Sequence, residues 1–144
     1  MWISDKKIIL VSGLVLWAIM LLWNHVLWMQ VNAWWMDIPM HILGGFWVAS
    51  IFIAIVESRP DIFEIKKRLL LSFILIVSFA VLIGVFWELW EYVFDYYFNV
   101  IIAQYSVSMT LSDTLGDLVS DLIGGIIATR IYLRALKSRI ENRE

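Results

Sequence analysis

Four long apolar stretches are the feature that most constrains the fold of this 144-residue chain. They cover residues 8–29, 38–57, 69–92 and 111–136, and each is close to or above the roughly 20 residues that a helix needs to cross a bilayer. Hydrophobic residues make up 62% of the chain and charged residues 17%, against about 45–50% and about 25% in soluble domains. This predicts an all-α, polytopic integral membrane protein, a single four-transmembrane-helix bundle over residues 1–144. A nucleic-acid binder and an average soluble enzyme are excluded.

The first stretch could be mistaken for a secretory signal, because Lys6 and Lys7 precede it. It is longer than the 7–15 apolar residues typical of a signal and contains Trp17, Asn24 and His25. We therefore expect a retained helix.

The basic residues predict the orientation. All eleven fall into three groups, at the N-terminus, between the second and third stretches, and at the C-terminus. They are Lys6 and Lys7; Arg59, Lys66, Lys67 and Arg68; and Arg130, Arg134, Lys137, Arg139 and Arg143. The positive-inside rule then gives four spans in the cell inner membrane with both termini cytoplasmic.

Acidic residues gather at the opposite, outer end. Seven of the thirteen lie there: Asp37, Glu88, Glu91, Asp95, Asp113, Asp117 and Asp121. Their spacing by three or four residues places each set on one face of its helix, and His41 joins Asp37 at i, i+4. We therefore predict that three helices bring polar stripes together at the same depth, in one cavity that opens outward.

The cost of burying these carboxylates points to a cation. A carboxylate near the bilayer centre costs roughly 2.5–3.5 kcal/mol on insertion scales and usually faces the bundle interior. The outer end has no Lys or Arg for ion pairs, so protons, water or a metal ion must compensate the charge. Carboxylates with an imidazole are typical ligands of metal sites in helical bundles. Oxygen-rich ligation favours Mg, Mn or Ca, and the imidazole leaves Zn and Fe open.

We predict five residues as ligands of a divalent metal ion: His41, Glu88, Glu91, Asp117 and Asp121. Asp37 or Asp113 is the candidate catalytic base. Simpler interpretations stay open, because Asp37 could cap its helix and Asp113 could complete a capping box with Thr110.

Small residues predict where helices approach closely. Gly116, Ser120, Gly124 and Ala128 recur every four residues, a spacing typical of tight contacts between membrane helices. The chain has no cysteine, which excludes disulfides and Cys-type metal sites.

Three motifs in order resemble a known family. They are Asp37-Ile-Pro-Met-His41, then Phe86-Trp-Glu88-Leu-Trp-Glu91, then Asp113-Thr-Leu-Gly-Asp117-Leu-Val-Ser-Asp121. This set resembles the YjdF-type bacterial inner-membrane proteins, which are similar in turn to the VanZ-like family of glycopeptide-resistance accessory proteins. The resemblance covers about residues 37–128. It implies the membrane architecture and the polar residue set, and it implies no particular reaction.

The first functional hypothesis is a metal-dependent hydrolase acting on a lipid or lipid-linked headgroup from the outer side. The alternatives are a non-enzymatic cation-binding or transport protein, and a scaffold that binds lipid or a partner. All of them predict contact with membrane lipids, and none involves nucleic acid. A homo-oligomer stays open.

Overall fold

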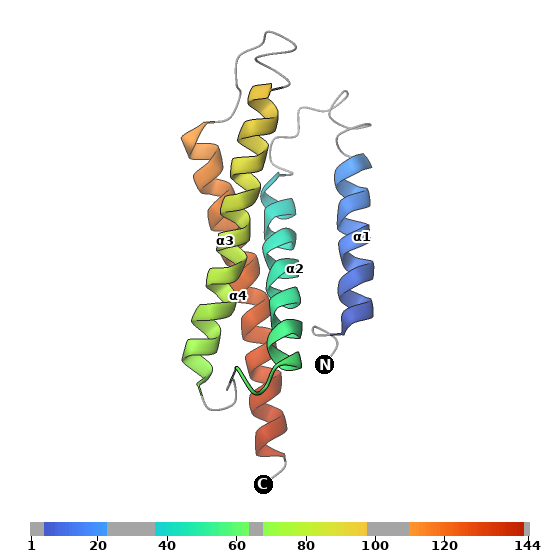
Figure 1. Ribbon diagram of the computed structural model, residues 1–144, viewed down its shortest axis with the longest axis vertical. Helices are drawn as coiled ribbons and strands as arrows, with labels where there is room; N and C mark the ends of the chain where they lie inside the picture. The colour runs from blue at the N-terminus through green and yellow to red at the C-terminus, as the bar shows by residue number, and fades with distance from the viewer. Residues whose placement is uncertain (1–4, 23–36, 64–67, 98–109, 143–144) are drawn as a thin grey trace.

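The computed structural model describes residues 5–22, 37–63, 68–97 and 110–142, and the described part of the chain is helical, without strands. Figure 1 shows its four helices, running alternately up and down. Their bounds are α1 (Lys6–Leu22), α2 (Asp37–Ser58), α3 (Leu69–Asp95) and α4 (Leu111–Glu141). The predicted all-α class is confirmed. The helix starts at 69 and 111 coincide with the predicted starts of the third and fourth stretches.

Two of the described helices are long and apolar enough to cross a membrane, namely α2 and α3 over Leu69–Phe94. In α4, 31 residues long, charged side chains interrupt the apolar sequence at both ends. The described part of α1 has 17 residues, and residues 23–29 of the predicted first span lie outside the described ranges. Four membrane spans therefore stay a prediction.

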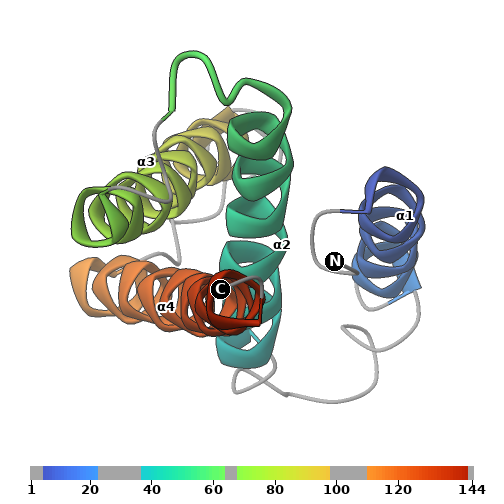
Figure 2. The ribbon, with the colours of Figure 1, turned by 90° about the horizontal axis from the view of Figure 1, so that it is seen from below.

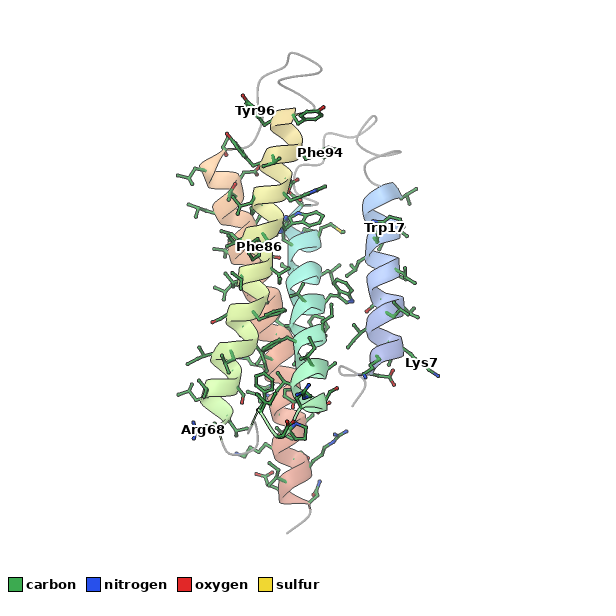
Figure 3. All side chains as sticks on the ribbon, viewed as in Figure 1. Lys7, Trp17, Arg68, Phe86, Phe94 and Tyr96 are labelled. Carbon is green, nitrogen blue, oxygen red and sulfur yellow. The ribbon has the colours of Figure 1, made fainter. Side chains whose placement is uncertain are left out.

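The charged residues divide the bundle into two ends. We call the end formed by the starts of α2 and α4 and by the last turns of α3 the acidic end, and the opposite one the basic end. Figure 3 shows Lys7 and Arg68 at the basic end, and Phe94 and Tyr96 at the acidic end.

Helices α2, α3 and α4 pack together, and α1 stands beside α2, as the view along the bundle shows (Figure 2). The closest approach is between α2 and α4. A Cβ atom at Gly45 would overlap the backbone of Asp121, and one at Gly124 would overlap the carbonyl of Ile42. These two glycines let the backbones touch, as small residues do between membrane helices.

The core of the bundle lies toward the basic end. It is built from apolar side chains of α2, α3 and α4 that are 0–8% exposed: Ala49, Ile53, Val56, Ile76, Val77, Ala80, Ala128, Tyr132 and Leu136. Two of its buried hydroxyls bond within their own helices. Ser50 donates to the Phe46 carbonyl at 2.8 Å, and Thr129 to the Gly125 carbonyl at 2.7 Å.

Helix α1 is attached to α2 through one indole. Trp47 Nε1 donates a hydrogen bond to the carbonyl of Ile9 at 2.7 Å. The Trp47 ring lies directly against Gly13, where a Cβ atom would overlap it. Because α1 leaves large apolar side chains such as Leu10 and Val11 exposed, its remaining surface is suited to hydrocarbon.

Candidate metal centre

His41 lies at the centre of the acidic end. It is the fifth residue of α2, one turn below Asp37, and carboxylates of three helices surround its ring. The Nδ1 atom is 3.3 Å from Asp121 Oδ2 of α4. The Nε2 atom is 3.7 Å from Asp37 Oδ1, 3.8 Å from Glu88 Oε1 of α3 and 3.9 Å from Asp117 Oδ1 of α4. The predicted convergence of the three polar stripes is thus found in the structure.

Most of this group is buried. The side chains of His41, Glu88, Asp117 and Asp121 are 6–8% exposed, whereas that of Asp37 is 49% exposed. Glu91, one turn after Glu88, is partly buried. We call these six residues the His41 cluster. Its exposed member is the first residue of α2, so the cluster opens toward the acidic end.

Glu88 is the least compensated group of the cluster. Both of its carboxylate oxygens are fully buried, and neither has a hydrogen-bond partner among the described residues. The Thr114 hydroxyl of α4 and the His41 ring lie beside it. A buried carboxylate with so few partners is expensive, so a cation or a proton would stabilise these two oxygens.

The geometry of the cluster suits such a cation. Two sets of ligand atoms, Asp37–His41–Asp117 and His41–Glu88–Glu91, each lie within 4.8 Å of one another. Ligands about 2.0–2.6 Å from a common ion lie no more than about 5 Å apart. Each set therefore needs only small side-chain movements to close on one ion.

A family of proteins described as "Predicted membrane protein (DUF2238)" matches residues 6–138 of the chain. The chain belongs to this family. No curated protein and no solved structure matches the chain.

Membership in DUF2238 confirms that the chain is a membrane protein, as the apolar stretches predicted. The matched range contains the whole His41 cluster and most of all four helices. The description of the family names no reaction, metal or ligand.

The carboxylate of Asp121 packs against a glycine of α3. A Cβ atom at Gly84 would overlap the Asp121 carboxylate, so only glycine leaves room for it between α3 and α4. The sequence analysis did not predict this contact between Gly84 and Asp121. The one signal in the sequence is that Gly84 precedes Glu88 by one turn.

The other predicted base, Asp113, lies apart from the buried group. It is exposed in the first turn of α4, and its backbone N–H donates to the Thr110 hydroxyl at 3.2 Å. This is half of the capping box that was left open as an alternative. Asp113 belongs to neither ligand set of the DUF2238 protein, although it precedes Asp117 by one turn. The side chains of Asp95 and His25 lie outside the described residues.

The predicted small-residue face of α4 is wrong at its first position. Ser120, Gly124 and Ala128 are buried, but Gly116 is exposed, and a Cβ atom there would meet nothing within 4 Å. Gly116 precedes Gly124 by roughly 12 Å of helix. The next residue, Asp117, is buried, so Gly116 lies on the side of α4 that faces away from the cluster.

Lys and Arg stand far from the cluster. Along α4 the first basic residue after Asp121 is Arg130, about 14 Å further on at 1.5 Å per residue. Ion pairs such as Arg59–Asp61 at 3.7 Å and Lys137–Glu141 at 3.8 Å lie at the basic end. The described part of the chain therefore offers the cluster no ammonium or guanidinium group.

Proposed function

We propose that this DUF2238 protein binds a divalent cation in its His41 cluster, inside the membrane. His41 would be the only nitrogen ligand, and Glu88, Glu91 and Asp117 would supply oxygens. Asp121 is in neither ligand set and faces the other ring nitrogen of His41, so it would join them only by moving its side chain. The observation that carries the proposal is the buried Glu88 carboxylate, which has no hydrogen-bond partner of standard geometry among the described residues and lies beside the other acidic side chains and one imidazole. Like charges at this spacing destabilise the fold unless protons, water or a cation compensate them.

The membrane topology is part of the same proposal. With α1 and α4 also spanning, the chain crosses the cell inner membrane four times and both termini are cytoplasmic. All eleven basic residues would then lie inside. The YjdF-type resemblance supports this location. The cluster would face the outer side.

The donor set limits the choice of cation. Carboxylate oxygens suit Mg, Mn and Ca, and one imidazole keeps Zn and Fe open. The chain has no cysteine, so sites that need thiolates are excluded.

The activity that we infer is hydrolysis of a lipid or lipid-linked headgroup. A divalent cation polarises phosphoryl or acyl oxygens and makes water a better nucleophile. Asp37 is the half-exposed member of the cluster and lies 3.7 Å from His41. As the base, it would accept a proton from an attacking water. Asp113 is the second candidate base, one turn from Asp117.

Ion transport is the alternative, and the bundle gives it less support. Of the buried hydroxyls nearer the basic end, those of Ser50 and Thr129 donate to a carbonyl of their own helix, and that of Ser72 donates to the carbonyl of Arg68, the N-cap residue of α3. The Tyr132 hydroxyl interacts with Glu57 of α2. These hydroxyls leave no chain of free polar groups through the described bundle. A through-pathway would need several copies of the chain.

Elemental analysis of the purified protein tests the proposal. We expect about one equivalent of a divalent metal in the wild type and at least a tenfold weaker affinity in Glu88→Gln, since outer-shell changes alone cost 10–100-fold. Glu141→Gln is the matched control, because this carboxylate is exposed at the other end. Metal-free wild-type protein after supplementation with each candidate metal would contradict the proposal.

A further inference from the structure

A second feature adjoins the His41 cluster, on the side of α1. A cavity of about 530 Å³ lies between α1, α2 and α3, and Asp121 of α4 contributes to its lining. This is within the range of about 300–1,000 Å³ that is typical of small-molecule sites.

The lining of the cavity changes from polar to apolar along the bundle. Its charged members are Asp37, His41, Glu91 and Asp121, at or near the acidic end. Further along, the walls are apolar and include Leu10 and Leu14 of α1, Val48 of α2 and Ile83 of α3. The cavity is therefore amphipathic, with one end in the proposed metal site.

Its length matches one leaflet of a bilayer. From Asp37 to Val48 the wall formed by α2 spans eleven residue steps, about 16 Å at 1.5 Å per residue. Half of a hydrocarbon core of about 30 Å is about 15 Å. A molecule with a polar group beside His41 and a chain reaching Val48 would fill the cavity from the membrane surface to its middle.

Glycines of three helices line the cavity. Each of the three helices contributes one to the lining: Gly13 of α1, Gly44 of α2 and Gly84 of α3. Gly13 is in contact with the Trp47 ring and Gly84 with the Asp121 carboxylate, so both are needed for packing. At Gly44, in contrast, a Cβ atom would meet only Asp121 Oδ1, at 3.9 Å. A side chain at Gly44 would therefore enter the cavity without a clash of its first carbon.

We propose that this cavity binds the hydrocarbon chain of a membrane lipid and holds its headgroup against the His41 cluster. The proposal rests on the proposed function, because it assigns the substrate of that site to single lipids with long chains. The apolar walls of the cavity would contact the hydrocarbon chain and supply most of the affinity. The polar end would fix the orientation of the lipid.

Photo-crosslinking tests the inference on the detergent-purified full chain. The probe is a phosphatidylethanolamine that carries a diazirine on its acyl chain. We expect saturable cross-links on Val48, which unlabelled phosphatidylethanolamine suppresses. Cross-links confined to exposed positions of α3 such as Leu82 and Phe86 would overturn the inference.

Two filling variants sharpen the test. Gly44→Leu should lower the cavity cross-links at least tenfold, whereas Gly116→Leu, with open space around its Cβ, should leave them unchanged. Leu14→Trp fills the cavity from α1, away from every proposed ligand, and covers the case in which Gly44→Leu does not fold. Undiminished cross-links in a folded filling variant would contradict the proposal.

The metal content of Leu14→Trp separates this inference from the proposed function. If the variant keeps its metal and loses the lipid, both stand. If metal binds and no cavity cross-link forms, only the lipid inference fails. Saturable cross-links in a protein that binds no metal would overturn the metal site and leave the chain-binding cavity. The cavity could instead be filled by a second copy of the chain. Native mass spectrometry of Leu14→Trp would then show loss of a dimer and no loss of lipid, and this result would overturn the inference.

Discussion

The two ends of the bundle of α2, α3 and α4 bury different kinds of side chain between the same helices. Toward the basic end, Ile53, Ile76 and Tyr132 pack with at most 2% of their surface exposed. At the acidic end, Glu88, Asp117 and Asp121 are almost as deeply buried around His41. The first arrangement stabilises the fold by itself, whereas the second costs stability unless a ligand offsets it. This difference locates the structural core and the candidate site at separate ends of the same helices.

The largest expected effect is the presence or absence of cysteine labelling, which reports which end of the bundle faces outward. The chain lacks cysteine, so single cysteines report on one position each. In intact cells a membrane-impermeant maleimide should label Ser112→Cys and leave Asp61→Cys unlabelled. Labelling of Asp61→Cys alone would reverse the proposed topology.

The second prediction removes packing from the basic end. Ile53→Ala should lower the free energy of unfolding by about 2–5 kcal/mol, because it leaves a cavity in a fully buried position. Its metal content should not change. Ile55→Ala, at a position 46% exposed on the same helix, is the control and should cost much less. The measurement is unfolding in mixed micelles. Equal losses for the two variants would show that this end is not a packed core.

The third prediction disturbs the acidic end without removing a ligand. Gly84→Ala places a carbon where the Asp121 carboxylate lies, so metal affinity should fall by roughly 10–100-fold, as for other supporting residues of metal sites. Gly116→Ala makes the same change in open space and should leave affinity unaltered. Competition with a metal-binding dye measures both. Identical affinities would argue against Asp121 as a ligand.

The sequence predicted the helices better than it predicted how they fit together. Helix starts at 69 and 111 follow from apolar periodicity, and the i, i+4 pair Asp37–His41 follows from helix geometry alone. Both features are local along the chain.

The contacts that complete the site depend on the register between helices. The room that Gly84 leaves for Asp121 and the exposure of Gly116 follow from where α4 crosses α2 and α3. A spacing of four residues cannot show which member of a small-residue face makes the contact. The role of the His41 cluster as a metal site stays a prediction.

Thermal unfolding with and without chelator tests the metal site most directly, in wild-type protein and in Glu88→Gln. A cation that binds only the folded state raises the melting temperature by mass action. With metal present, wild type should melt above Glu88→Gln. In chelator the order should reverse, because the variant no longer buries an unpartnered carboxylate. A wild-type melt that chelator does not change, with Glu88→Gln more stable in both conditions, would contradict the account.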